Sequence, residues 1–288
     1  MSVKNFMPTI WSKNIYDKAE EKGALVQDCN REYEGEVQYA HSVKILGVGE
    51  VTVGNYVGQD IEYEEMSTFE SVLDIDVAKY FATDIPDIDK AQANPALFED
   101  YTNRAANSVA LARDKYIGAL VAGKAQSSED EEAKNSNYKP GAVNVIVATN
   151  KTRAAIRAAF DAAMVKLKEK NFFDPGVIET APADYALFRD DLVELKTSND
   201  DLIRRGVVGT YYQYEVKETN NVYRDENFAY AIVRSKRCVA FAGQIHDVEA
   251  GRREKKFADY VRGLNVFGAK IIDQDQLVVV KIPLIATA

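Results

Sequence analysis

The sequence predicts an α+β fold in which a long β-hairpin and a long helix stand apart from a compact α/β-like region. Residues 43–85 contain three β segments around a glycine-rich turn region, and residues 95–123 follow as one helix. Residues 140–243 then alternate between strand-like and helical patterns. A lone hairpin is marginal in water, and its open edges favour pairing with another chain. The pattern therefore predicts a subunit that copies of itself complete.

The composition is ordinary for a soluble globular protein. The 288 residues suffice for one large or two small domains, with 46% hydrophobic and 28% charged residues. A net charge of −9 argues against tight wrapping of nucleic acid, which needs clustered cations. We find neither a signal-peptide pattern nor an apolar run near the ~20 residues of a membrane span. We therefore expect a protein that is made in the cytoplasm and has no membrane partner.

The first 32 residues are predicted to form an arm with one apolar helical face. That much apolar surface must dock on the chain's own body or on a neighbour. The residues expected to make this contact are Phe6, Ile10 and Trp11.

The hairpin is predicted from a strand over 42–53, turns at 54–55 and 58–59, and a returning strand over 60–65. Leu73, Ile75 and Val77 then alternate with polar or small residues, which predicts a half-buried third strand. The hairpin residues expected to contact a neighbouring subunit are Val51, Val53, Gly54, Asn55, Tyr56, Gly58, Ile61 and Tyr63.

The long helix begins with Asn94 and Pro95, which suit the N-cap and the first helical position. One narrow apolar stripe then runs to about residue 123, a span of roughly 40 Å. This geometry predicts a helix laid across a sheet. Its expected core residues are Leu97, Tyr101, Val109 and Tyr116.

The compact region is predicted to contain strands and helices in alternation. Its expected strands cover residues 142–148, 177–180, 206–216 and 228–241. One helix is expected after a cap at Asn150 or Thr152, and a second helix is expected over residues 182–192. The remaining strands are expected at 256–263, 265–272 and 276–283, in a sheet beneath the long helix.

The candidates for chemistry are weak. His41 and His246 lack metal-ligand spacing, and the two cysteines, Cys29 and Cys238, are best interpreted as free buried thiols. Asp74 and Asp76 lie on one face of the predicted strand, roughly 7 Å apart, but any half-exposed strand shows that alternation. We therefore predict no catalytic residue, no metal site and no cofactor, and hence no enzyme. The basic run at residues 252–256 suits either nucleic acid or a partner's acidic residues.

Several stretches, in order, resemble the major capsid proteins of tailed phages, whose Hong Kong ninety-seven type fold is shared with herpesvirus capsids and encapsulins. These stretches are residues 5–11 (NFMPTIW), 49–53 (GEVTV), 87–95 (DIDKAQANP) and 257–270 (FADYVRGLNVFGAK). Their order and spacing cover essentially the whole chain.

The resemblance implies a division of the chain into four parts. Residues 1–32 would be the N-arm, and residues 33–139 the extended E-loop and the peripheral domain with its spine helix. Residues 140–243 would be the axial domain, and residues 244–288 the return strands of the peripheral domain.

The resemblance also implies the partners. The chain would self-assemble through hexamers and pentamers into an icosahedral virion shell around double-stranded DNA, which it faces without sequence-specific binding. A separate scaffolding protein, a portal and, in some relatives, a decoration protein would assist. Two alternatives remain: an encapsulin-like cellular shell, and an acid-dependent hydrolase using Asp74 and Asp76.

Overall fold

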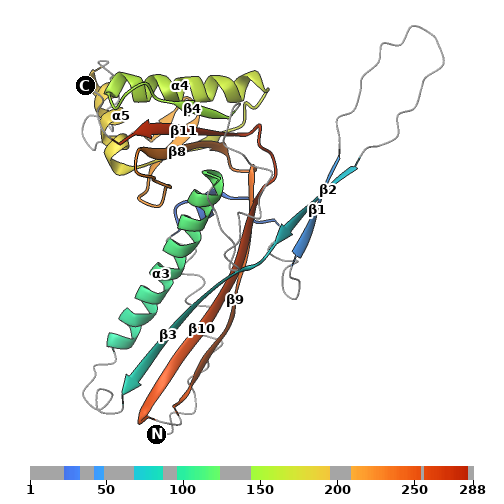
Figure 1. Ribbon diagram of the computed structural model, residues 1–288, viewed down its shortest axis with the longest axis vertical. Coiled ribbons are helices and arrows are strands. Elements are labelled where there is room, and N and C mark those ends of the chain that lie inside the picture. Colours follow the sequence, from blue (N-terminus) through green and yellow to red (C-terminus); the bar gives the residue numbers. More distant parts are fainter. Residues whose placement is uncertain are drawn as a thin grey trace, which may run out of the picture.

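The computed structural model describes residues 23–32, 42–48, 68–86, 96–123, 144–194, 209–253 and 256–284. Its described strands form three sheets: a long three-stranded sheet, a six-stranded sheet and a two-stranded ribbon. Figure 1 shows the long sheet with one helix beside it, the six-stranded sheet with one helix above it and another at its left, and the ribbon directed away from both. The α+β class predicted from the sequence is therefore confirmed.

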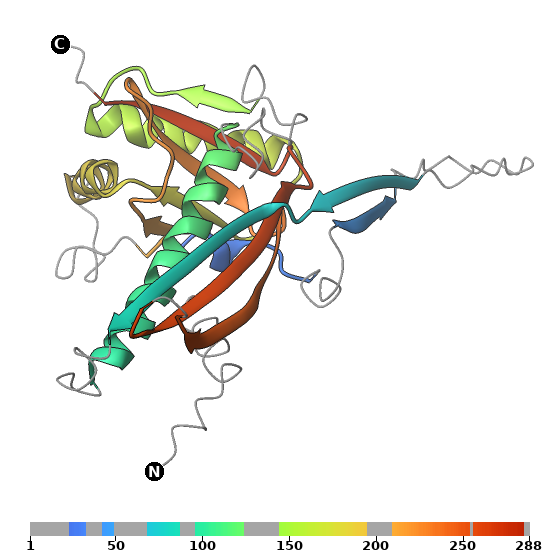
Figure 2. The same ribbon diagram turned by 60° about the horizontal axis from the view of Figure 1, so that its bottom comes forward.

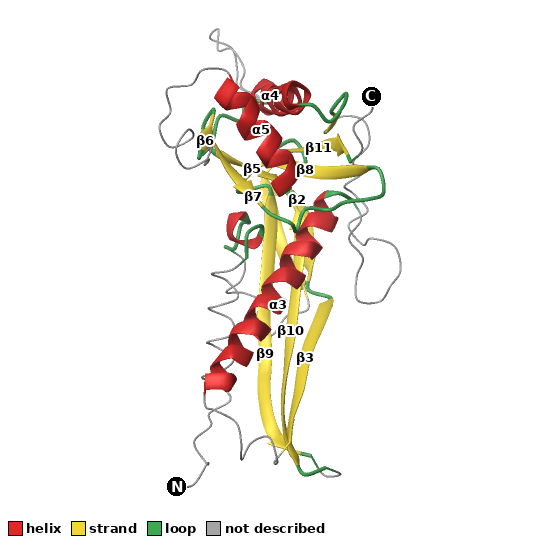
Figure 3. Cartoon of the chain, turned by 90° about the vertical axis from the view of Figure 1, so that its left-hand side faces the viewer, coloured by secondary structure: helices red, strands yellow, loops and turns green. Residues whose placement is uncertain are grey.

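The long sheet consists of β3 (Val77–Pro86), β10 (Ala258–Ile271) and β9 (Val239–Arg252), in the spatial order β3-β10-β9. Both strand pairs are antiparallel. Helix α3 (Ala96–Val121) runs along one face of this sheet (Figure 3). Its 26 residues span about 39 Å. The predicted long helix across a sheet is therefore confirmed.

The contact between α3 and the long sheet depends on small residues. The ring of Phe81 packs against Ala106, Val109 and Ala110 of the helix. Phe81 is paired across the strands with Gly263, where an added Cβ would lie 2.4 Å from the ring. Alanines on the helix and a glycine in β10 therefore let the aromatic ring fill the space between the two elements.

The six-stranded sheet has the order β4-β11-β8-β5-β7-β6. The pairs β4–β11 and β5–β7 are parallel, and the other pairs are antiparallel. Its strands are β4 (Val145–Val147), β5 (Gly176–Thr180), β6 (Thr210–Tyr211), β7 (Tyr214–Glu218), β8 (Phe228–Ser235) and β11 (Leu277–Pro283).

Both faces of this sheet are covered, so its central strands are mostly apolar. Helices α4 (Arg153–Glu169) and α5 (Pro182–Glu194) pack on one face, where Ala231 and Val233 of β8 point. On the other face, Tyr230 and Ile232 of the same strand join a second core.

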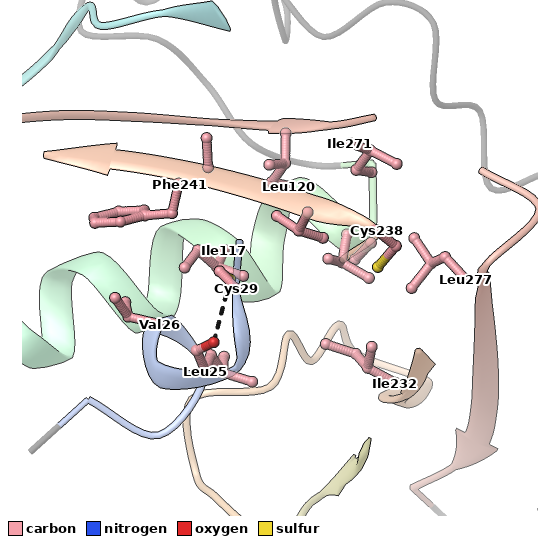
Figure 4. Close-up of a cluster of buried hydrophobic side chains, with 14 of the residues drawn as sticks. Leu25, Val26, Cys29, Ile117, Leu120, Ile232, Cys238, Phe241, Ile271 and Leu277 are labelled. Carbon is pink, nitrogen blue, oxygen red and sulfur yellow. Dashed lines mark hydrogen bonds between the residues drawn. The ribbon is translucent and has the colours of Figure 1, made fainter. Parts of the chain in front are cut away.

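This second core joins the six-stranded sheet to the long sheet. It brings together Ile117 of α3, Phe241 of β9, Leu277 of β11 and Leu25 beside the short helix η1 (Val26–Asp28). Figure 4 shows these side chains converging from four separate stretches of the chain. The two halves of the subunit therefore share one continuous apolar contact.

The ribbon pairs β1 (Ser42–Val48) with β2 (Thr68–Asp74) in antiparallel register. Figures 1 and 2 show it on the side of the long sheet away from α3. A projecting two-stranded element was predicted, but the first strand pairs with residues 68–74. The expected returning strand at 60–65 lies outside the described residues.

Several sequence predictions are wrong in detail, three of them in the sheets described above. Strand β11 lies in the six-stranded sheet between β4 and β8, and not with the long sheet as expected for residues 276–283. The expected strand at 228–241 is two strands, β8 and β9, which belong to different sheets. The two strands expected at 256–263 and 265–272 form the single strand β10, whose register with β9 shifts between Gly263 and Leu264.

Among the described helices, none combines the length and the apolar character that a membrane crossing requires.

Candidate functional site

The ribbon of β1 and β2 is the part of the described chain that leaves the body. Its outermost cross-strand pair is Val48 with Thr68. At the end of the ribbon nearest the body, here called the ribbon root, Val43 and Leu73 are paired and buried. They pack on Ala240 of β9. Among the described residues no third strand pairs with the ribbon. Within the described part of the chain, both of its edges are therefore unpaired, as edges that accept a strand of another chain are.

The ribbon root crosses β10 at very short range. A Cβ added to Gly268 would lie 2.0 Å from the backbone oxygen of Asp74, so only glycine fits at this crossing. Beside it, Nζ of Lys270 donates a 2.7 Å hydrogen bond to the carbonyl oxygen of Val72. These contacts fix the direction in which the ribbon leaves the body.

The residues predicted to contact a neighbour lie outside the described part of the chain. For the hairpin these are Val51, Val53, Gly54, Asn55, Tyr56, Gly58, Ile61 and Tyr63. For the arm they are Phe6, Ile10 and Trp11. The structure therefore leaves these contacts as predictions.

The predicted core of the long helix is described at two of its four positions. Val109 is buried against the long sheet. Tyr116 is partly buried and meets Phe267 edge to face, with ring centroids 5.4 Å apart. Leu97 and Tyr101 lie in α3, but their side chains are outside what the structure describes.

Residues 23–32, the described end of the predicted arm, lie at the junction between the two large sheets. Asp114 of α3 accepts hydrogen bonds from the backbone N–H groups of Ala24, Leu25 and Val26, at 2.8, 3.1 and 3.1 Å. Nδ2 of Asn221 also donates to this carboxylate, at 3.0 Å. Burial raises the pKa of Asp114, although these hydrogen bonds oppose the rise.

Arg234 of β8 reaches the same segment from the six-stranded sheet. Its guanidinium donates to the carbonyl oxygens of Asp28 and Leu25, at 2.8 and 2.9 Å. It also forms a two-point ion pair with Glu179 of β5, at 2.7 and 3.0 Å. The Arg234 side chain is fully buried. Burial disfavours the charged form of the Arg234 guanidinium. The carboxylate of Glu179 outweighs this effect, so the pKa of Arg234 is raised.

Two further contacts complete the junction. The buried carboxylate of Asp28 pairs with Lys217 at 2.6 Å and with Lys236 at 3.1 Å. Asn30 forms a parallel bridge to β9, donating its N–H to the carbonyl oxygen of Val239 at 2.8 Å and accepting from the N–H of Phe241 at 2.9 Å. The segment is therefore bonded to α3, to the six-stranded sheet and to the long sheet.

These buried charges were not predicted from the sequence. Arg234 and Glu179 each stand alone inside an otherwise apolar strand, in the runs FAYAIVRS and GVIET. A single charge in a strand buried on both faces needs a buried partner. That signal was present, but the partner of each residue lies far away in the sequence.

The candidates for chemistry remain scattered. In the part of the chain that the structure describes, no three His, Cys, Asp or Glu side chains gather as metal ligands would. Asp74 ends β2, while Asp76 lies in the break before β3, so the single strand expected to align them is interrupted. His246 lies in β9, and its side chain is outside the described set.

Neither cysteine is poised to react. Both thiols are free and buried, as predicted from the sequence. Burial raises the pKa of Cys29 to about 11 and that of Cys238 to about 12. At neutral pH both therefore stay protonated, the unreactive form of a thiol.

The sequence matches no protein-family model and no curated protein. Its structure is similar to a chain of Mycobacterium phage Che8, with a TM-score of 0.69 and 22% identity over 90% of both chains. It is also similar to the capsid of the cyanophage P-SCSP1u, with a TM-score of 0.64 and 14% identity over 84% of both chains.

A third match is the capsid of Ralstonia phage GP4, with a TM-score of 0.63 and 13% identity over 86% of this chain and 84% of that chain. In all three matches the likeness covers at least 84% of this chain. The chain therefore has the α+β fold of bacteriophage capsid subunits.

Proposed function

We propose that this chain is the major capsid protein of a tailed bacteriophage and assembles with its own copies into an icosahedral shell around double-stranded DNA. The observation that carries the proposal is the match to phage capsid structures over at least 84% of both chains. The projecting ribbon with two open edges supports it, because such an element suits a subunit that neighbours complete.

The family's parts can be assigned to the described elements as part of this proposal. The ribbon and the residues between its strands would be the E-loop, and α3 the spine helix of a peripheral domain built on the long sheet. The six-stranded sheet with α4 and α5 would be the axial domain, with β11 added to the range 140–243. Residues 1–32 would be the N-arm.

The proposal includes the partners that the resemblance implies. Hexamers and pentamers of this chain would form the shell, with a scaffolding protein, a portal and, where the virus has one, a decoration protein. The packaged DNA would face the shell without sequence-specific contacts. The protein would reside in the virion, after assembly in the host cytoplasm.

The phage capsids named above favour a viral shell over an encapsulin-like cellular shell. The hydrolase alternative loses support because Asp74 and Asp76 do not share a strand. A non-enzymatic, structural role suits the chain best.

Expression of the full chain, followed by gel filtration and negative-stain microscopy, tests the proposal. We expect capsomers or closed shells in the megadalton range. A homogeneous monomer at high protein concentration would contradict the proposal. Particles of the expressed chain that hold a protein cargo and no double-stranded DNA would instead favour the cellular shell.

A further inference from the structure

Two of the connections between the long sheet and the six-stranded sheet lie at one place. The chain passes from β8 to β9 through residues 236–238, and from β10 to β11 through residues 272–276. These turns are hydrogen-bonded to each other: the N–H of Ile272 donates to the carbonyl oxygen of Cys238 at 2.8 Å, and the N–H of Ser235 donates to that of Gln276 at 3.1 Å. Two adjacent connections of this kind have the geometry of a hinge.

Residues 24–30 lie between the bodies on either side of these connections. From the long-sheet side, Asp114 on α3 holds three backbone N–H groups of the segment. From the six-stranded sheet, Arg234 holds two of its carbonyl oxygens. Three backbone donors of the segment are therefore bound by one body, and two of its backbone acceptors are bound by the other.

The apolar side chains of the segment follow the same division. Leu25 and Val26 are almost fully buried in the shared core. In that core lie Ile117 and Leu120 from α3, and Ile232 from β8. The segment thus makes both polar and apolar contacts with each body. Together these two sets of contacts restrict the angle between the two sheets more than either set would alone.

The charges at the junction depend on the segment in return. Arg234 and Asp114 are 0% and 1% exposed. If the segment moved away, each would lose backbone partners while still largely removed from water, which is costly for an ionised group. Breaking a buried pair leaves an uncompensated charge, so the arrangement with the segment in place is favoured over one without it.

We infer that residues 24–30 act as a wedge that fixes the angle between the long sheet and the six-stranded sheet, so that the shape of the subunit depends on the seating of its N-terminal arm. The wedge itself follows from the contacts above. Its consequence for a shell rests on the proposed function: subunits with a loose wedge would close into shells of irregular size.

The first test measures the distance between the two bodies on the full-length chain. Spin labels are placed at Ala82→Cys on β3 and Ala162→Cys on α4, two exposed positions, with labelled chain diluted in unlabelled chain. The native thiols need no removal, because they are buried and protonated at neutral pH. We expect one narrow distance distribution for this reference protein.

The test variant is Asp114→Asn, which keeps the side-chain shape but directs an amide toward N–H donors. We expect a broadened or displaced distance distribution, and hydrogen exchange at residues 24–26 about tenfold faster or more. The matched control is Asp161→Asn, which removes a carboxylate that accepts from the Tyr211 hydroxyl at 2.8 Å, away from the junction. Asp161→Asn should change neither the distance distribution nor the hydrogen exchange at residues 24–26.

A milder variant, Asp28→Asn, removes the charge that pairs with Lys217 and Lys236 and serves if Asp114→Asn does not fold. Faster exchange at residues 24–26 with an unchanged, narrow distance distribution would overturn the inference. Unchanged exchange in both variants would overturn it as well.

Electron microscopy of the same variants separates this inference from the proposed function. Irregular shells from Asp114→Asn beside uniform shells from the reference protein would support both. If the reference protein forms no shell, the proposed function fails, while the distance measurement still decides whether the wedge sets the angle.

Discussion

At Gly268 the backbone of the ribbon root crosses β10 so closely that no side chain fits between them. The obstructing atom is a backbone oxygen, which cannot swing aside as the end of a flexible side chain would. The position of the whole ribbon relative to the body therefore depends on the absence of a side chain at residue 268.

Gly268→Ala is expected to lower the free energy of unfolding by about 1–3 kcal/mol, because the strands must separate to admit the Cβ. Chemical denaturation of the purified protein measures this. Ala78→Ser, at an exposed position of β3, is the control and should stay within about 0.5 kcal/mol. Equal stability of wild type and Gly268→Ala would mean that the crossing is looser than described.

The two thiols predict an alkaline loss of stability. Burial raises the pKa of Cys29 to about 11, whereas an unfolded cysteine ionises near pH 8.5. The native state then binds more protons than the unfolded state, so the free energy of unfolding should fall as pH rises from about 9 toward 11.

The same burial predicts slow thiol labelling. At pH 8 an aromatic disulfide reagent should react with the native thiols roughly a hundredfold more slowly than with the denatured chain. Fast labelling of either cysteine in the folded protein would contradict their placement in the core.

Residue-scale prediction from the sequence succeeded where a pattern was local and failed where a partner was distant. Val109 follows from helical spacing alone. The lone charge of Arg234 in an apolar strand indicates a buried partner but does not identify it, because the groups that satisfy it, at residues 25, 28 and 179, come together only in the folded chain.

Helix α3 is the element that the sequence predicts best, because one apolar stripe of 3.6-residue period decides it. Val109→Asp places a charge against Phe81 and the long sheet, where Val109 is buried. We expect a loss of several kcal/mol, seen as a lower melting temperature or insoluble protein.

Asn107→Asp, on the exposed side of the same helix, is the matched control and should fold normally. Soluble Val109→Asp protein with an unchanged melting temperature would show that this face of α3 does not pack on the sheet.

The sequence did not predict strand boundaries where the turns contain no glycine or proline. The β6–β7 turn uses Tyr212 and Gln213 at positive φ, so the expected strand at 206–216 hid a hairpin. The turn after β8 contains Lys236 and Arg237 and likewise has neither glycine nor proline. The sheet membership of β11 had no local signal, since parallel pairing with β4 joins residues more than 130 positions apart.

The register of the ribbon permits a sharp test of its function. Because Val48 pairs directly with Thr68, residues 49–67 can be replaced by Asn-Gly, which closes a two-residue hairpin turn. We expect a folded subunit with a melting temperature close to wild type that forms no shells by electron microscopy. Normal particles from this variant would rule out the ribbon as the contact between subunits.

At the scale of the whole molecule, the subunit combines two well-packed sheets with parts that extend beyond them. Its net charge of −9 makes copies repel at low ionic strength, so association must come from many modest contacts. Under the proposed function, strand addition at the edges of the ribbon would be one such contact, and apolar burial of the arm would be another.

The most direct measurement is a density map of the assembled protein that resolves residues 49–67. We expect these residues to lie on a neighbouring copy, with strand pairing or apolar contacts across the boundary. A map in which they fold back onto their own subunit, with no neighbour against them, would contradict the claim that each copy completes the next.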